Sequence, residues 1–304
     1  LCSALGLGIE RLDRIGEMAF GSLDTPLGLT QACMILLGMC TILYLLVTVV
    51  KDSRQHKAPK TVDVFVLVTL VFDVVMLLAW WVTPYIQTEM WCQVAFVLDY
   101  ACGIGGELVM CCFAHLAFST ITRTPTETQR AVSPKETRDS YIRYSVFVLI
   151  VLCALSACVV IGDMGDYAMG TAGQCWFIYD THNYSLKWFE IPQGLTIVVT
   201  IAYLYRGYRH IRSLSGQHLA SKSTMWNYAA LSFPVPILRM VPTVANACFS
   251  LLVVFGLDTE KHSGLYSSMG LLACTTPLCT LVAYAIPRWI IAHASPPTKA
   301  PYPV

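Results

Sequence analysis

The sequence predicts an all-α fold: a seven-transmembrane helix bundle with the N-terminus outside the cell and the C-terminus in the cytoplasm. Three observations predict it. The chain of 304 residues is 56% hydrophobic and only 13% charged, whereas soluble domains carry about 25% charged residues. Seven stretches are long and apolar enough to cross a bilayer. Lys and Arg are unequally shared between the segments that join these stretches.

A transmembrane helix needs about 20 mainly apolar residues. The stretches that meet this requirement are 27–50, 62–83, 91–121, 141–162, 187–208, 226–255 and 264–292. They predict a transmembrane domain over 27–292, an extracellular or juxtamembrane segment over 1–26 and a cytoplasmic Pro-rich tail over 293–304. The lipid bilayer is the expected partner. A net charge of +1 disfavours nucleic acid, because domains that bind it are strongly basic.

The orientation follows from the positive-inside rule, by which Lys and Arg accumulate in cytoplasmic loops. Of the 20 basic residues, 15 lie after the first, third and fifth stretches or in the tail. The opposite side has only Arg11, Arg14, Lys187 and Lys261. We therefore expect residues 122–140 inside and the segment between the fourth and fifth spans outside.

Cys92 and Cys175 share the predicted outer side. Cys92 lies at the mouth of the third span, and Cys175 lies in the longest outer loop, within "AGQCWF". Because a disulfide can persist in that oxidising compartment, we expect the two to be bonded; the alternative is a pair of free thiols. The same loop contains "NYS", which makes Asn183 a candidate N-glycosylation site.

Three ionisable residues, Asp73, Glu107 and Arg239, lie near the middle of the second, third and sixth spans. Charges at bilayer depth are costly and usually face the bundle interior. We expect Arg239 to pair with Glu107, with Asp73 as the second candidate. The pair is either a structural salt bridge or a lock that rearranges on activation. Two carboxylates near one guanidinium also favour a retained proton.

Nearer the outer face, Asp99, Tyr100, Trp188 and Glu190 are candidate ligand-binding residues. Aromatic walls with a few polar groups are typical of a small-molecule pocket, and two carboxylates favour a cationic or hydroxyl-bearing ligand. The alternative is a belt of solvated charges and interfacial aromatic residues. No metal or other cofactor is expected: Cys111 and His115 share a helical face, but a structural zinc site usually needs four ligands. The "GIGG" stretch at residues 103–106 predicts close helix packing.

Two segments carry a resemblance to a known family. "GQCWF" at residues 173–177 resembles the Cys-Trp outer loop of the cyclic-AMP-receptor-like and secretin-like groups of the G-protein-coupled receptor superfamily. "FPVPILRMVPTVANACF" at residues 233–249 is similar to the Pro-rich sixth helix of the cyclic-AMP-receptor-like group. The chain departs from rhodopsin-like receptors, because "FSTITR" and "LVAYAIPRW" stand where those receptors have Asp-Arg-Tyr and Asn-Pro-x-x-Tyr.

The resemblance implies a plasma-membrane receptor that transmits the binding of a small extracellular ligand to a heterotrimeric G protein at the basic inner loops. The alternatives are a structural or accessory subunit of a membrane assembly and a proton-coupled small-molecule transporter. No enzyme is expected, because the spacings of paired catalytic carboxylates and of His-rich metal motifs are missing. A retinal-binding protein is excluded, because residues 264–292 contain no lysine to form a Schiff base.

Overall fold

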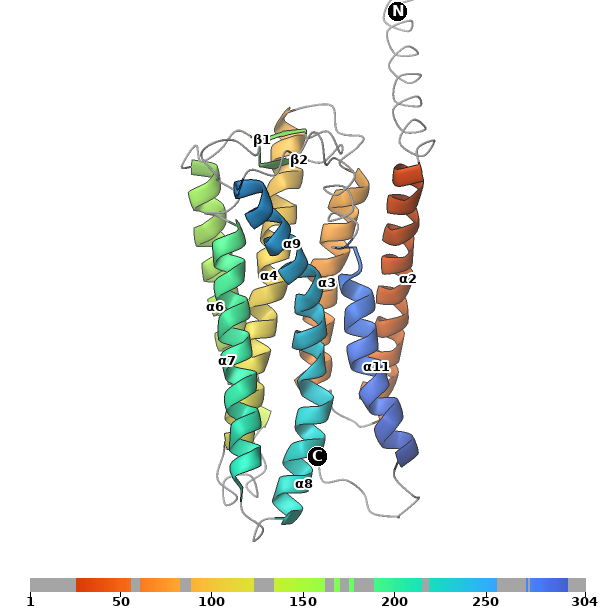
Figure 1. The fold of residues 1–304 in the computed structure, drawn as a ribbon, viewed down its shortest axis with the longest axis vertical. Helices are drawn as coiled ribbons and strands as arrows, with labels where there is room; N and C mark the ends of the chain where they lie inside the picture. Colours follow the sequence, from red (N-terminus) through yellow and green to blue (C-terminus); the bar gives the residue numbers. More distant parts are fainter. Residues whose placement is uncertain are drawn as a thin grey trace, which may run out of the picture.

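The helices of the chain lie side by side in one elongated bundle (Figure 1). The computed structural model describes residues 26–55, 61–82, 89–122, 134–161, 167–169, 175–177, 189–214, 219–255, 272 and 274–294. The helices are α2 (Pro26–Gln55), α3 (Thr61–Val82), α4 (Glu89–Thr122), α6 (Pro134–Ile161), α7 (Ile191–Ser213), α8 (Leu219–Ser232), α9 (Pro234–Val254) and α11 (Thr276–Ala294). They run alternately up and down the bundle, and α8 and α9 follow each other along one pass (Figure 1).

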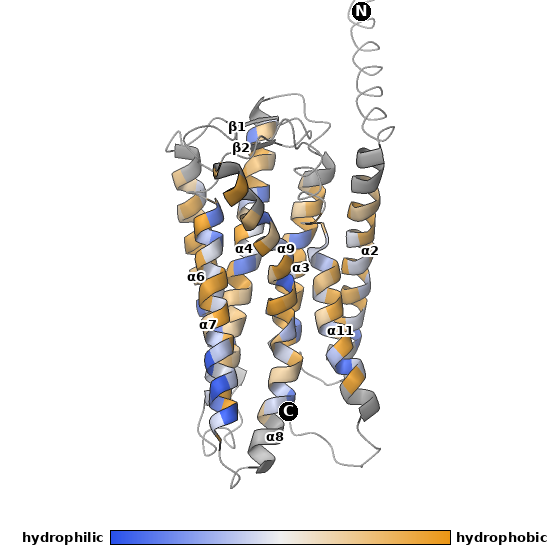
Figure 2. Ribbon diagram, in the orientation of Figure 1, coloured by the Kyte–Doolittle hydropathy of each residue, from blue (hydrophilic) through white to orange (hydrophobic). Residues whose placement is uncertain are grey.

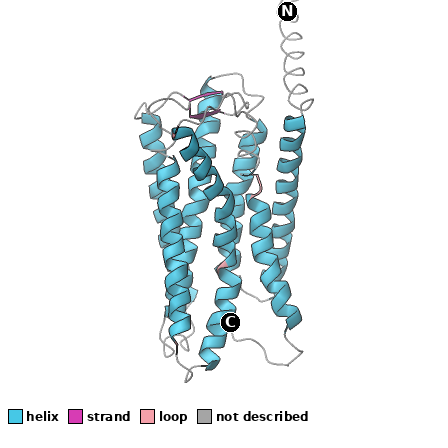
Figure 3. Ribbon diagram, in the orientation of Figure 1, coloured by secondary structure: helices cyan, strands magenta, loops and turns pink. Residues whose placement is uncertain are grey.

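Two short strands lie across the end of the bundle at which α4 begins (Figure 3). β1 (Tyr167–Met169) and β2 (Cys175–Phe177) pair antiparallel, with Met169 opposite Cys175. Every other element in the described part of the chain is a helix. The all-α prediction is therefore confirmed for the bundle itself, and the strand pair is a small addition that was not predicted from the sequence.

α4 is the central helix. It packs against α3, α6, α7, α9 and both strands. Of its membrane-length stretch 67% is buried, against 6% for the stretch in α6. The hydrophobic core follows α4 from Phe96 through Tyr100 to Phe113. Side chains on α4 are thus enclosed by other helices, whereas α6 lies at the periphery.

The glycines of α4 allow its neighbours to approach closely. A Cβ at Gly103 would lie 3.2 Å from the ring of Phe189, and a Cβ at Gly105 would lie 2.6 Å from the ring of Phe72. Small residues at such positions let transmembrane helices pack tightly. The predicted close-packing surface at residues 103–106 is confirmed.

Apolar side chains cover the outside of the bundle, the reverse of a soluble protein. Large hydrophobic residues such as Leu43, Leu149 and Val198 are 62–64% exposed. Extended apolar surface of this kind marks contact with a membrane or a partner. Among the residues that the structure describes, five helical segments are long and apolar enough to cross a bilayer: Ala32–Lys51, Val62–Ala79, Trp91–Thr122, Arg138–Cys158 and Met225–Cys248. The protein is therefore a membrane-embedded helical bundle.

The fifth and seventh predicted spans, α7 and α11, are not among these five segments. The C-terminal end of α7 is hydrophilic (Figure 2), because it carries Arg206, Arg209, His210 and Arg212. The structure describes α11 from Thr276, so most of its predicted outer half lies outside the described residues, as do residues 1–25 and 295–304. The seven-span topology and the orientation of the termini remain predictions.

The sixth predicted span, 226–255, is two helices that meet at Phe233. Pro234 begins α9 and Pro236 follows two residues later. Proline has no amide hydrogen and its ring clashes with the carbonyl four residues earlier, so regular helical hydrogen bonding is interrupted here. Phe233 still donates its N–H to the carbonyl oxygen of Ala229 at 2.8 Å. As a result, α8 and α9 remain stacked end to end (Figure 1).

Candidate functional site

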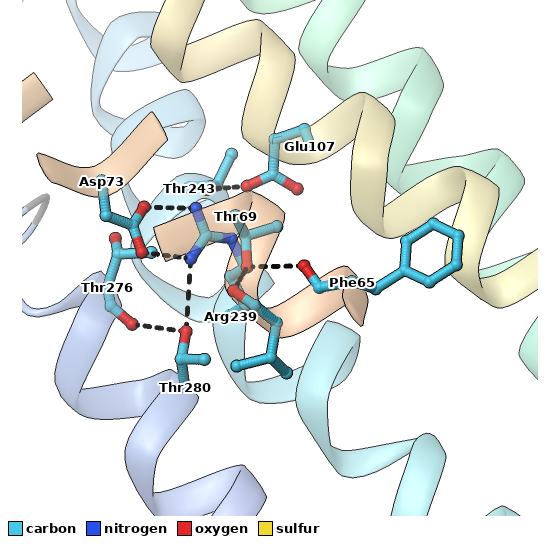
Figure 4. A network of polar contacts seen from close by, with 9 residues as sticks. Phe65, Thr69, Asp73, Glu107, Arg239, Thr243, Thr276 and Thr280 are labelled. Carbon is cyan, nitrogen blue, oxygen red and sulfur yellow. Dashed lines mark hydrogen bonds and ion pairs between the residues drawn. The ribbon is translucent and has the colours of Figure 1, made fainter. Parts of the chain in front are cut away.

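A buried ion pair joins α3 to α9 inside the bundle (Figure 4). Arg239 Nη1 donates to Asp73 Oδ2 at 2.8 Å, and Nη2 donates to Oδ1 at 2.5 Å. Arg239 is 4% exposed and Asp73 is 1% exposed. Two parallel charge-assisted hydrogen bonds are the strongest arrangement between a guanidinium and a carboxylate. Such geometry is what offsets the cost of removing both charges from water.

Threonines extend the ion pair to a third helix. Arg239 Nη1 also donates to Oγ1 of Thr280 on α11 at 3.2 Å, and the Thr280 hydroxyl donates to the carbonyl oxygen of Thr276 at 3.0 Å. On α3, Thr69 donates in the same way to the carbonyl oxygens of Phe65 and Val66. A threonine hydroxyl bonded to its own helix needs no other acceptor for its proton. One guanidinium therefore connects α3, α9 and α11.

Glu107 has a different partner from the one expected. Its Oε1 accepts a hydrogen bond of 2.9 Å from Thr243 Oγ1, and within the described part of the chain it forms no ion pair with Arg239. The prediction of an Arg239–Glu107 pair is wrong, and the second candidate, Asp73, is confirmed. The physical reason is the rotation of each helix about its own axis. The sequence predicted a similar depth in the membrane for both carboxylates, but it did not predict which side of α9 faces each of them. Thr243, one turn beyond Arg239 on α9, faces Glu107 (Figure 4).

Gly106 makes space for the guanidinium. A Cβ at this position of α4 would lie 2.8 Å from Arg239 Nη2, which is closer than an unstrained contact. Gly106 directly precedes Glu107. α4 therefore contacts the ion pair with a residue that has no side chain, and the next residue supplies a carboxylate nearby. The predicted network of Asp73, Glu107 and Arg239 is therefore one buried polar cluster with two separate sets of bonds.

A second polar cluster, which was not predicted from the sequence, joins α3 to α11. Asp63 Oδ1 accepts from the Tyr284 hydroxyl at 2.8 Å and from Arg288 Nη2 at 3.2 Å. The Arg288 guanidinium also lies 3.4 Å from the centre of the Tyr284 ring, a favourable cation–π distance. Asp63 and Tyr284 are both buried. Opposite charges near the ends of the second and seventh predicted spans were the available signal.

Of the candidate ligand-binding residues, Asp99 and Tyr100 lie about three turns into α4, and Glu190 directly precedes α7. Tyr100 is fully buried in the hydrophobic core, with its ring 6.0 Å from that of Phe189. Asp99 is half-buried beside it on α4, and Glu190 is buried at the start of α7. Trp188 lies outside the described residues. Tyr100 therefore packs against a neighbouring helix instead of lining open space, and ligand binding by these four residues remains a prediction.

Cys92 is buried near the start of α4 and is disulfide-bonded. Cys175 begins β2, which packs against α4. Its side chain lies outside the described residues, so the pairing of Cys92 with Cys175 remains a prediction. Asn183 also lies outside the described residues.

His115 is held by aromatic residues. Its Nδ1 lies 2.7 Å from the hydroxyl of Tyr144 on α6, and its ring is 4.9 Å from that of Tyr203 on α7. Among the residues that the structure describes, no three His, Cys, Asp or Glu side chains are placed to hold a metal ion. The histidine joins three helices by packing and a hydrogen bond.

The chain matches no protein-family model, and no curated protein matches it. The resemblance to G-protein-coupled receptors therefore depends on the residues quoted above.

Proposed function

We propose that the protein is a cell-surface, receptor-like seven-helix protein that transmits the binding of a small extracellular ligand to a heterotrimeric G protein. The observation that carries the proposal is the buried Asp73–Arg239 ion pair. Replacing a buried ion pair by apolar residues is often neutral or stabilising, so this pair is a poor device for stability alone. Ionisable residues at membrane depth are functional candidates by default.

In this proposal the ion pair acts as a lock. It joins helices that are distant in sequence, and releasing it requires α9 to move relative to α3 and α11. The break at Phe233 and Pro242 inside α9 provide points at which that pass of the bundle can bend, because sharp helix bends usually occur at proline. α8 lies at the opposite end of the bundle from β1 and β2 (Figure 1), so a bend would displace the predicted cytoplasmic end.

The outer end supplies the proposed ligand-binding side. Asp99, Tyr100, Trp188 and Glu190 would receive a cationic or hydroxyl-bearing ligand, and a Cys92–Cys175 disulfide would hold the outer loop over them. Peptide mapping without reduction tests the pairing: both thiols free in surface-expressed protein would contradict it. The basic inner loops would form the G-protein surface.

Nucleotide exchange on purified heterotrimeric G proteins tests the proposed function. With the full chain in lipid nanodiscs, we expect Asp73→Asn and Arg239→Gln to shift basal exchange in the same direction. The double variant should add little to either, because interacting residues are non-additive. Glu107→Gln, which alters the neighbouring carboxylate, is the matched control. If the variants fold in lower yield but show unchanged nucleotide exchange per folded molecule, the ion pair has only a structural role.

A proton-coupled transporter is the second candidate, and Glu107 favours it. This carboxylate is 5% exposed and accepts its hydrogen bond from a neutral hydroxyl, and buried carboxylates at membrane depth are typical of proton pathways in transporters. Uptake of labelled small molecules into proteoliposomes under a proton gradient separates the two candidates. Transport abolished by Glu107→Gln, with no nucleotide exchange in any variant, would favour the transporter.

A further inference from the structure

A basic groove lies between the C-terminal ends of α4 and α7. Its volume is about 410 Å³, and its lining includes Phe118 and Thr122 from α4 and Tyr205, Arg206, Arg209 and His210 from α7. The groove is separate from the buried clusters around Arg239 and Asp63, which join α3 to α9 and α11. It is also at the other end of α7 from Glu190.

The chemistry of the groove suits a phosphate-bearing anion. Arg206 and Arg209 are both exposed, and no acidic residue is among the lining residues. In the described part of the molecule, neither arginine forms an ion pair with a carboxylate. Arg209 extends its guanidinium 6.0 Å from the centre of the Tyr205 ring. Two uncompensated guanidinium groups around one concave surface raise the local concentration of anions.

The surface that adjoins the groove is apolar. Leu195, Val198 and Ile201, on the preceding turns of α7, are 51–64% exposed. α7 also packs along α4, which contains a membrane-length apolar segment, so the exposed apolar part of α7 lies at the same depth as that segment. Beyond it, α7 becomes hydrophilic (Figure 2). Tyr208 and Trp226 meet there edge to face at 5.7 Å, and such residues concentrate at membrane–water interfaces.

We propose that this groove binds the headgroup of an anionic phospholipid. Arg206 and Arg209 would contact the headgroup phosphate, and the acyl chains would lie along the exposed apolar residues of α7. A lipid is the occupant favoured over a soluble phosphate because the basic groove is continuous with that apolar surface. Basic pockets between transmembrane helices on the cytoplasmic side are suited to such headgroups. The proposal depends on α7 spanning the membrane and is independent of G-protein coupling.

Native mass spectrometry of the purified full chain tests the proposal. The probes are phosphatidylinositol 4-phosphate and phosphatidylcholine, each added to the protein in detergent. We expect the wild-type chain to bind the anionic lipid preferentially, and Arg206→Gln and Arg209→Gln to lower its affinity about fivefold each. Arg212→Gln is the matched control, because Arg212 is an exposed arginine of the same helix outside the groove. It should leave the affinity within about twofold of wild type.

Three results would overturn the lipid assignment. Equal affinity for the two lipids would show that the charge of the groove is irrelevant. An equal loss with Arg212→Gln would indicate diffuse surface charge instead of a site. Displacement of the lipid by an equal concentration of free inositol phosphate would assign the groove to a soluble anion. The melting temperature of each variant without added lipid shows whether it is folded, and exposed substitutions such as these are expected to leave it unchanged.

Discussion

Arg239 is the residue on which the interior of the bundle is organised. Its guanidinium has five donors and remains charged at every physiological pH. Here three hydrogen bonds from Nη1 and Nη2 go to Asp73 and Thr280, and Nε is buried with no hydrogen-bond partner in the described part of the molecule. Gly106 leaves space for the guanidinium because it has no side chain. An arginine at the centre of a membrane helix costs at least about 2.5–3.5 kcal/mol. Its position is therefore tolerable only because each of these neighbours is present.

Removal of the Asp73 charge should destabilise the protein far more than removal of the Glu107 charge. Asp73→Asn leaves a buried guanidinium without its counter-charge, so we expect a loss of about 3 kcal/mol. Glu107→Gln keeps an oxygen that Thr243 can donate to, and a loss below about 1 kcal/mol is expected. Thermal unfolding of both variants in the same detergent measures the difference. Equal losses would show that Arg239 depends on both carboxylates.

Gly106→Ala should also be destabilising. The new Cβ would meet Arg239 Nη2 at 2.8 Å, and the guanidinium cannot retreat without losing a bond to Asp73, so we expect a cost of about 1–3 kcal/mol. Gly194→Ala on α7 is the control, because nothing lies within 4 Å of its Cβ position. There the better helix propensity of alanine should leave stability unchanged or slightly improved. A tolerated Gly106→Ala would mean that the ion pair has room to shift.

At the scale of elements, α3 carries two aspartates that bind arginines on other helices. Asp73 bonds to Arg239 on α9, and Asp63 bonds to Arg288 on α11. Ten residues of α-helix separate the two, about 15 Å along the axis. α3 is thus tied to two other helices at two levels, and a movement of α9 or α11 must break or carry along one of these bonds.

The Asp63 cluster should contribute measurably to stability. Tyr284→Phe removes one buried hydrogen bond and keeps the ring, for an expected loss of about 0.5–1.5 kcal/mol. Arg288→Gln removes both the ion pair and the cation–π contact, and a larger loss of about 1.5–3 kcal/mol is expected. Arg138→Gln is the control, because its ion pair with Asp139 is 3.9 Å long and exposed and such pairs contribute little. If calorimetry showed that Arg288→Gln lowers the free energy of unfolding no more than the control, the stabilising role of the cluster would be contradicted.

At the scale of the whole molecule, polar groups are concentrated inside the bundle and apolar side chains on its outside, the reverse of a soluble protein. Charged residues such as Asp63, Asp73, Glu107 and Arg239 are buried, whereas many leucines, isoleucines and valines of α2, α6 and α7 are exposed on the outside of the bundle. In a bilayer the solvent is apolar, so this arrangement is the stable one. Helices suit it because their backbone groups are satisfied within each segment.

The orientation of the bundle can be tested in sealed cells that express the chain at their surface. The charge distribution predicts that residues 122–140 are protected from an external protease and that Asn183 carries a glycan. Permeabilised cells should lose the 122–140 loop to the same protease, which controls for accessibility. Cleavage of that loop from outside would reverse the orientation and with it the proposed location of the disulfide and of the lipid site.

The sequence by itself determined that the protein is a membrane-embedded helical bundle and where its main helices lie along the chain. Bilayer thickness fixes the length of an apolar stretch. The predicted spans therefore agree within a few residues with the apolar parts of four helices, α2, α3, α4 and α6. Some of these helices also continue into polar ends that lie outside the predicted spans. The cost of an intramembrane charge likewise placed Asp73, Glu107 and Arg239 inside the bundle. The division of the sixth span at Phe233 was signalled by Pro234 and Pro236, although the prediction ran the span through it.

Only the tertiary structure decided which of these residues meet. Position along the chain gives the depth of a residue in the membrane, but its partner depends on how each helix is rotated about its axis and which helices are neighbours. That rotation is set by packing, including the contact of Gly106 with Arg239 and of Thr243 with Glu107. Because of this packing, Arg239 pairs with Asp73 and Asp63 pairs with Arg288. The same packing brings together the ends of α4 and α7 that line the basic groove, although the lining residues of the two helices are at least 80 positions apart in the sequence.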